Sequence, residues 1–151
     1  MRVGLISDTH GLLRPEALDA LADVEVIIHG GDIGGPEVLE RLAALAPVHA
    51  VRGNNDQGPW AGKLPVTLVL PLAGVRIQVV HDVKHLSIEP GAARPQVVVS
   101  GHSHKPGVVE RDGVLFVNPG SAGPRRFNLP VTVGYLTLVN GSAEAQLRNL
   151  L

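Results

Sequence analysis

The stretch MRVGLISDTHG (residues 1–11) decides the fold, because an apolar run leads directly into polar side chains. Residues 1–6 are apolar without alternation, which is typical of a short buried strand. Asp8, His10 and Gly11 follow at once. In parallel α/β sheets, ligands bind outside the carboxyl ends of the strands. The stretch therefore predicts a parallel sheet with a polar site at its edge.

The same succession repeats outward through the first half of the chain. Helices are expected to begin near Pro15 and Pro36, since proline is tolerated in a first helical turn. Strands are expected at 24–29 and 48–51, and each of them ends in polar residues and glycine. Alternation of strand and helix predicts parallel strands joined by right-handed crossovers.

The second half favours strands. Pairs of strands are expected at 66–70 with 75–80, at 108–111 with 114–118, and at 131–139 with 143–147, with a further buried strand at 97–100. Asp112-Gly113 and Asn140-Gly141 are typical hairpin turns. Each half is too small for a good core of its own. We therefore expect one α/β domain spanning residues 1–151.

Composition excludes several classes of function. The chain has 151 residues and no cysteine, which rules out disulfides, thiolate-bound metals and thiol nucleophiles. Thirteen basic and fourteen acidic residues leave a net charge of -1, and aromatic residues make up only 3%. These values argue against a nucleic-acid partner. The apolar runs are far shorter than the ~20 residues of a membrane span, and residues 1–10 do not resemble a signal peptide. We expect a cytoplasmic protein without a membrane partner.

Polar side chains that can bind metals follow five of the expected strands. They are Asp8, His10, Asp32, Asn54, His81, His102 and His104. Asp8 and His10 are two residues apart, as are His102 and His104, so in an extended chain each pair would point the same way. Glycines beside them suit tight turns or close backbone approach.

This donor set favours a pair of metal ions. Two carboxylates, four imidazoles and one amide suit Mn, Fe, Co, Ni or Zn better than copper(I) or calcium. Seven ligands exceed one tetrahedral zinc and suit two metals that share a carboxylate. Two divalent ions, two aspartates and a bridging hydroxide carry a net charge of +1, which attracts a phosphate monoanion.

Each piece has a plainer interpretation when it stands alone. Gly31-Asp32 and the segment 54–56 are ordinary turn sequences, and His29 at the end of a buried strand suits a packed or hydrogen-bonded side chain. The ordered occurrence at successive strand ends favours the metal site. His85 lies near the same edge and is a candidate for substrate contact.

The motifs together resemble the calcineurin-like metallophosphoesterases. The segments that carry the resemblance are Asp8-Thr9-His10, Gly31-Asp32, Gly53-Asn54-Asn55-Asp56, His81 and Gly101-His102-Ser103-His104. The length and Asn118-Pro119-Gly120-Ser121 are similar to the small bacterial and archaeal phosphodiesterase branch. The resemblance implies an αββα sandwich of two mixed sheets flanked by helices.

The resemblance also implies roles. One metal would be held by Asp8, His10 and His104, the other by Asn54, His81 and His102, with Asp32 bridging them. The ions would be manganese first, with Fe, Ni, Co or Zn as alternatives, about 3.5–4 Å apart. A metal-bridging hydroxide would attack the phosphorus of a small phosphodiester, and Asn54 would also contact substrate.

Three features depart from the family pattern. Asn55 stands where many relatives have a histidine proposed to protonate the leaving group. Asp82 stands where glycine often follows the ligand histidine. The segment 82–94 is short and interrupted by proline and glycine, which predicts a reduced capping element.

Two other functions remain open on this sequence. One is a catalytically silent interaction scaffold, for which the related retromer subunit is a precedent. The other is a phosphomonoesterase or nucleotidase, against which the missing histidine weighs. The chain retains a candidate ligand at every position, which favours the enzyme. The natural substrate, the physiological metal and the oligomeric state are left open.

Overall fold

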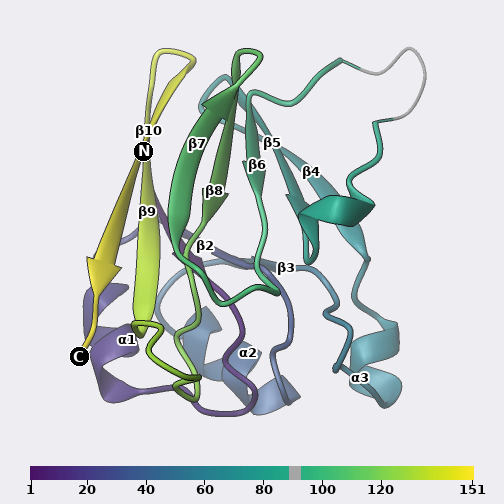
Figure 1. The fold of residues 1–151 in the computed structure, drawn as a ribbon, viewed down its shortest axis with the longest axis vertical. Coiled ribbons are helices and arrows are strands. Elements are labelled where there is room, and N and C mark those ends of the chain that lie inside the picture. The colour runs from purple at the N-terminus through teal and green to yellow at the C-terminus, as the bar shows by residue number, and fades with distance from the viewer. Residues whose placement is uncertain (89–92) are drawn as a thin grey trace.

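The computed structural model describes residues 1–88 and 93–151, which form two mixed sheets and few helices (Figure 1). The elements in chain order are β1 (Arg2–Ile6), α1 (Pro15–Ala20), β2 (Val26–His29), α2 (Pro36–Ala43), β3 (Val48–Ala50), α3 (Pro59–Gly62), β4 (Thr67–Leu72), β5 (Val75–Val80), the 3-10 helix η1 (Val83–His85), β6 (Val97–Val99), β7 (Gly107–Arg111), β8 (Val114–Asn118), β9 (Thr132–Val139) and β10 (Ser142–Asn149).

Each sheet has five strands and combines parallel with antiparallel pairs. The first has the order β10-β9-β1-β2-β3, and the second β4-β5-β6-β8-β7. Strands β1, β2 and β3 are parallel, as are β5, β6 and β8. The hairpins β4–β5, β7–β8 and β9–β10 form at the predicted places. Asp112 and Asn140 adopt the positive φ that such turns require.

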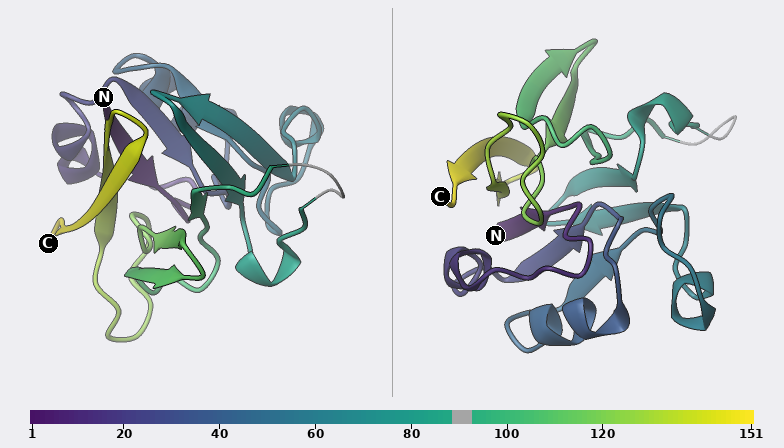
Figure 2. Two further views of the ribbon diagram at one scale, coloured as in Figure 1. Left: turned by 90° about the horizontal axis from the view of Figure 1, so that it is seen from above. Right: turned by 60° about the horizontal axis from the view of Figure 1, so that its bottom comes forward.

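Apolar side chains fill two layers. One lies between the sheets, where Val3 and Leu5 of β1 pack with Ile77 and Val79 of β5 and with residues of β2, β6, β8 and β9. The other lies between the first sheet and the helices, and Ile27 belongs to it. The first sheet is thus covered on both faces, which explains why β1 and β2 are apolar without alternation. Figure 2 shows α1 and α2 on the outer side of β1–β3 and the second sheet on the other side.

The helices are short, and two of the three were predicted. Both α1 and α2 begin at a proline, and α2 buries Val38 and Leu42 one turn apart. The four-residue helix α3 was not predicted, because Gly58, Pro59 and Gly62 are typical of a loop. Its Trp60 is half-buried against the helical layer.

The prediction of two mixed sheets with flanking helices is confirmed for both sheets and for the helices that cover the sheet β10-β9-β1-β2-β3. Of the expected short segment 82–94, the structure shows η1, and residues 89–92 lie outside the described residues. Within the described ranges, no helix combines the length and apolarity needed to cross a membrane.

Candidate metal centre

The predicted ligands gather at the carboxyl ends of parallel strands from both sheets. Asp8 and His10 follow β1, Asp32 follows β2, and Asn54 comes after β3. His81 follows β5, and His102 with His104 follows β6. Because the parallel strands of each sheet end on the same side, five loops meet at one edge.

The backbone of these loops is not extended, so the condition under which the two-residue spacing would point each Asp-x-His or His-x-His pair the same way is not met. Left-handed φ angles occur at five of the seven candidates: Asp8 (55°), His10 (47°), Asp32 (54°), His102 (71°) and His104 (63°). Aspartate and histidine tolerate this conformation better than branched residues. Strained backbone of this kind persists where the surrounding structure over-determines it, which is common at functional sites.

Two glycines allow the loops to approach one another, as predicted. A Cβ on Gly53 would lie 2.0 Å from the backbone nitrogen of Asp32. A Cβ on Gly101 would lie 2.0 Å from Oγ of Ser7 and 2.6 Å from Oδ2 of Asp8. Any other residue at position 53 would therefore push the loops after β2 and β3 apart, and one at position 101 would displace the side chains of Ser7 and Asp8.

Asp8, His10 and His104 form one compact group of potential ligands. Oδ1 of Asp8 lies 3.4 Å from Nε2 of His104 and 4.0 Å from Nε2 of His10. The two imidazoles are stacked, with ring centroids 5.4 Å apart. This is the first ligand group that the family resemblance implied, and the structure brings all three residues together.

A second group consists of Asp8, Asp32 and His81. Oδ2 of Asp32 lies 3.3 Å from Nε2 of His81 and 3.8 Å from Nε2 of His10. Asp32 therefore lies between His10, an expected ligand of one metal, and His81, an expected ligand of the other, which is the position of a bridging ligand. Asp8 belongs to both groups, which the sequence did not predict.

Asn54 and His102 lie beside the second group. Oδ1 of Asn54 is 3.2 Å from Nδ1 of His102, and the rings of His102 and His81 meet edge to face at 5.2 Å. Both side chains are more exposed than the other candidates. Nε2 of His102 points elsewhere and lies 3.6 Å from Oδ2 of Asp82.

His81 is oriented as metal-binding histidines are. Its Nδ1 donates to the carbonyl oxygen of Gly30 at 2.7 Å, so that Nε2 carries the lone pair in the neutral ring. That lone pair faces the carboxylates of Asp8 and Asp32. Two negative groups and a lone pair aimed at one point repel one another unless a proton or a cation lies between them.

The hydrogen bonds support a cation at this place. Within the described part of the chain, four buried polar atoms of the site have no hydrogen-bond partner: Asp8 Oδ1, His10 Nε2, His81 Nε2 and His104 Nδ1. Buried polar groups are normally paired, and such a concentration of unpaired ones needs an explanation. Oxygen and imidazole donors converging on one locus fit a divalent transition metal.

The two carboxyl groups differ in their pKa. Burial raises the pKa of Asp8 above its ordinary value and outweighs the hydrogen bond from the Ser7 hydroxyl. Burial also acts on Asp32, but the His81 ring, when it carries a proton on Nε2, and two hydrogen bonds from Asn55 outweigh it and hold the pKa of Asp32 below its ordinary value. Of the two carboxyl groups, Asp8 thus depends more on a nearby cation to stay ionised.

Three supporting residues were missed at the sequence level as parts of the site. Ser7 donates to Oδ2 of Asp8 at 2.7 Å. Asp56 is buried, and its carboxylate accepts the backbone N–H groups of Ile33, Gly34 and Gly53. Asn118 donates to the carbonyl oxygen of Gly101 and so fixes the His102–His104 loop. Ser7 and Asp56 stand beside ligand motifs, and Asn118 belongs to the Asn118–Ser121 motif; these positions were the only signals of such a role.

Asn55 and His85 occupy different places at the site. The backbone N–H of Asn55 donates to Oδ1 of Asp32 at 2.8 Å, and its side-chain amide donates to Oδ2 at 3.1 Å. His85 is exposed and lines a cavity of about 700 Å³ that adjoins His81, His102 and Asn54. Asn55 therefore orients Asp32, while His85 faces the space available to a substrate.

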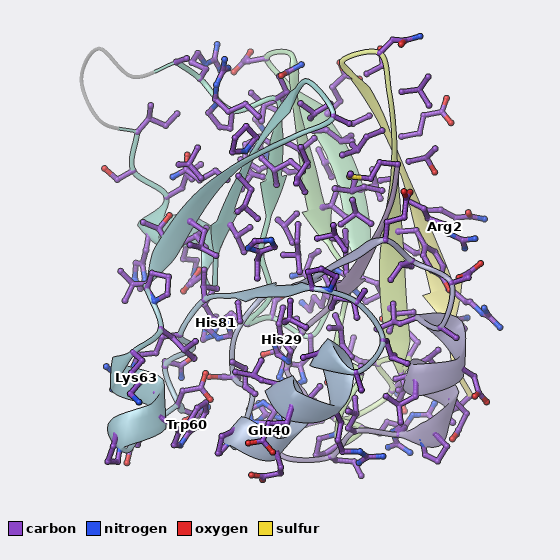
Figure 3. All side chains as sticks on the ribbon, turned by 180° about the vertical axis from the view of Figure 1, so that it is seen from behind. Arg2, His29, Glu40, Trp60, Lys63 and His81 are labelled. Carbon is purple, nitrogen blue, oxygen red and sulfur yellow. The ribbon has the colours of Figure 1, made fainter. Side chains whose placement is uncertain are left out.

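His29 is a fully buried, neutral histidine. The prediction that it is a hydrogen-bonded residue is confirmed. The N–H of Gly31 donates to Nδ1, so Nε2–H donates to Oγ1 of Thr9, which itself donates to the carbonyl oxygen of Ile33. Figure 3 shows His29 and His81 near each other where β2 and β5 end. Burial lowers the pKa of His29 to about 3.

This environment predicts an acid-side loss of stability. The unfolded ring takes up a proton below about pH 6.5 and the folded ring only near pH 3, so the free energy of unfolding should fall with decreasing pH, by at most about 1.4 kcal/mol per pH unit from this group. We expect His29→Gln to remove the contribution of this residue to the pH dependence of the free energy of unfolding. Urea unfolding at pH 7, 6 and 5, in chelator to exclude metal effects, measures it. Parallel pH dependences in the two proteins would contradict the assignment.

Comparison with known proteins points to one family. Residues 1–141 match the model of the "Calcineurin-like phosphoesterase superfamily domain". The chain is 36% identical over 136 residues to a "Probable metallophosphoesterase" of Methanothermobacter thermautotrophicus, covering 80% of this chain and 77% of that protein. It is 28% identical to a phosphodiesterase of Methanocaldococcus jannaschii, covering 90% and 92% of the two chains. Among solved structures, Vps29 of Entamoeba histolytica complexed with Zn²⁺ superposes with a TM-score of 0.65, at 26% identity and full coverage of both chains.

Proposed function

We propose that this chain, which belongs to the calcineurin-like phosphoesterase superfamily, is a dinuclear metal-dependent phosphodiesterase that acts on small phosphodiesters. The observation that carries the proposal is the convergence of Asp8, Asp32 and the buried histidines, with four of their polar atoms unpaired among the described residues. A bound cation accounts for such a concentration of unpaired donors.

The ligand assignment proposed here follows the family pattern and the geometry. Asp8, His10 and His104 would hold one ion, and Asn54, His81 and His102 the other, with Asp32 between them. The contacts of Asp8 with His10, His81 and His104 favour a share for it in both groups. When bound, two divalent ions supply a water of lowered pKa as nucleophile and neutralise charge on the phosphate.

The chain's own residues prepare the site for that chemistry. Ser7 and the backbone N–H of His102 hold one oxygen of Asp8, which leaves Oδ1 directed at the histidines. Two hydrogen bonds from Asn55 help to keep Asp32 ionised, as does the His81 ring while it is protonated. Asp56 ties the loops after β2 and β3 together through three backbone N–H groups. The donors are thus held in place before any ligand arrives, which lowers the cost of binding.

The proposal is tested by assaying metal-reconstituted protein. The chain would be stripped with chelator, reloaded separately with Mn, Fe, Co, Ni and Zn, and offered aryl and alkyl phosphomonoesters and phosphodiesters. We expect metal-dependent hydrolysis with diesters preferred. Hydrolysis of monoesters alone would favour the phosphomonoesterase alternative instead.

A scaffold role is the second candidate, because the structure resembles Vps29 across its whole length. The completeness of the candidate ligand set favours the enzyme over the scaffold, which needs no ligand. Absence of hydrolysis with every metal and substrate, in protein that binds the metals, would favour the scaffold.

Asn55 makes a separate prediction about leaving groups. A positioned general acid typically contributes about 10²–10⁴-fold, and a carboxamide has no proton to give near neutral pH. Rates should therefore fall steeply as the leaving-group pKa rises, from aryl to alkyl diesters. Asn55→His should flatten this dependence, whereas Asn55→Gln, which remains an amide, should leave it steep. Rate constants over a series of substituted esters measure the slope, and a shallow slope in the native protein would show that another group, with His85 the first candidate, supplies the proton.

A further inference from the structure

Asp82 places a carboxylate in the wall of the cavity beside the metal centre. It directly follows His81 and lines the cavity of about 700 Å³ together with His81, His102 and Asn54. Its side chain is 17% exposed. Its Oδ1 accepts the backbone N–H of Lys84 at 3.0 Å, which fixes the carboxylate in the wall. The proposed metal chemistry gives this group no role.

The geometry places Asp82 next to the ligands and not among them. His102 turns Nδ1 toward Oδ1 of Asn54, its proposed fellow ligand, and turns Nε2 toward Oδ2 of Asp82 at 3.6 Å. The compact ligand groups found in the described residues are Asp8–His10–His104 and Asp8–Asp32–His81, without Asp82. A carboxylate near the second ring nitrogen of a ligating histidine is a common arrangement. Asp82 also lines the cavity, so its charge adjoins the space available to a substrate.

That charge matters for the kind of phosphate the site accepts. A phosphodiester carries one negative charge, whereas a phosphomonoester has a second pKa near 6 and carries close to two above pH 7. Arg52 and His85 line the same cavity, and Nε of Arg52 donates to the carbonyl oxygen of Asp56 at 3.1 Å, which positions the guanidinium and leaves its positive charge in place. Asp82 faces the ring of His102, a proposed metal ligand, and lines the cavity in which the rest of the substrate would lie. The second charge of a monoester would therefore meet the carboxylate of Asp82.

We propose that Asp82 is a specificity-determining residue that disfavours dianionic phosphomonoesters and so restricts the site to monoanionic phosphodiesters. The inference rests on the proposed function and names the charge state of its substrates. The cavity has the size of typical small-molecule sites, so an organic group on the phosphate finds room beside the charge.

The first test compares matched substrates in Asp82→Asn. This variant keeps an oxygen to accept the Lys84 N–H and removes only the charge. The substrates are p-nitrophenyl phosphate, a monoester, and its methyl ester, a diester, both at pH 8. In Asp82→Asn the ratio of kcat/KM for the monoester to kcat/KM for the diester should rise about tenfold. This is the size of the repulsion expected between the carboxylate of Asp82 and the second negative charge of the monoester in a partly exposed site. Asp82→Glu, which keeps the charge, should retain the native preference.

A matched control uses the same chemical change elsewhere. Asp112 lies in the turn before β8, at the opposite end of the parallel strands from the ligand loops, and its φ of 54° is one that asparagine tolerates. Asp112→Asn should leave the ratio unchanged.

A binding measurement provides a readout independent of turnover. Calorimetry on Mn-loaded protein would compare phenylphosphonate, a dianion at pH 8, with its monoanionic methyl ester. In Asp82→Asn the dianion should gain about tenfold more affinity than the monoanion. An equal change for both ligands, or a loss of Mn affinity with unchanged preference, would overturn the inference.

The outcomes separate this inference from the function on which it rests. A native metal-loaded chain that hydrolyses neither ester contradicts the proposed function. Diester hydrolysis with the same preference in Asp82→Asn as in the native chain overturns the role of Asp82 alone.

Discussion

Asp32→Asn is expected to reduce phosphodiesterase activity at least about 10³-fold, more than any other single ligand change. Oδ2 of Asp32 lies between Nε2 of His81 and Nε2 of His10, one histidine from each proposed metal. The substitution removes the negative charge that both ions would share. The measurement is kcat/KM for an aryl diester at saturating Mn, together with bound Mn per chain.

The control separates this effect from a general loss of structure. Asparagine keeps an oxygen that can accept the N–H of Asn55, which bonds Asp32 at 2.8 Å, so the fold should persist. Asp112→Asn, remote from the site, should have native activity. Activity of Asp32→Asn within tenfold of the native value would exclude a bridging role for this carboxylate.

Removal of metal is expected to lower the melting temperature by roughly 10 °C or more. Each of the two proposed ions, bound at 100 times its Kd, stabilises the folded chain by about 2.7 kcal/mol, and the melting temperature of a chain of this size shifts by about 2–4 °C for each kcal/mol. The cause is local. Without a cation, the carboxylates of Asp8 and Asp32 and the lone pair of His81 converge unopposed, and the unpaired buried atoms of the site stay unpaired.

The measurement is thermal unfolding with Mn and with excess chelator. The Asp32→Asn chain is the control for direct effects of the chelator, since its melting temperature should respond far less. A native chain whose melting curve is the same in both conditions would not form the site in the way proposed here.

The positions of the ligands followed from the sequence because strand ends are local features. An apolar run that stops at Ile6 and continues as Asp8 and His10 shows where a strand ends and where polar groups gather. The parallel pairing of β1 with β2 then follows from general rules of sheet topology. These rules predicted the parallel sheet and the edge where the candidates meet, whereas the arrangement in two mixed sheets was implied by the family resemblance alone.

The conformation of the loops did not follow from the sequence. Spacing by two residues suggested extended pairs, yet Asp8, His10, His102 and His104 have left-handed backbones. Their conformation is set by tertiary contacts, such as the hydrogen bond from the N–H of His102 to Oδ2 of Asp8, 94 residues away in the chain. Nothing in a local pattern encodes a contact of that range.

The hydrogen-bond partners of individual side chains could not be predicted either, because they too depend on tertiary contacts. Asp56 looked like part of a turn, but its carboxylate joins the loops after β2 and β3. Asn55 was noted only as the residue that replaces the proposed acid histidine of many relatives. Its hydrogen bonds to Asp32 became visible only in the structure. A sequence shows which chemical groups are present, whereas their pairing depends on how the sheets are placed together.

That this chain uses two metal ions to hydrolyse phosphodiesters can be checked in a single titration. Metal-free protein would be titrated with Mn²⁺, with bound metal and hydrolysis of an aryl phosphodiester measured in the same samples. We predict saturation at two ions per chain, with activity rising mainly as the second ion binds. Saturation at one ion per chain, or activity that does not depend on metal, would contradict the claim.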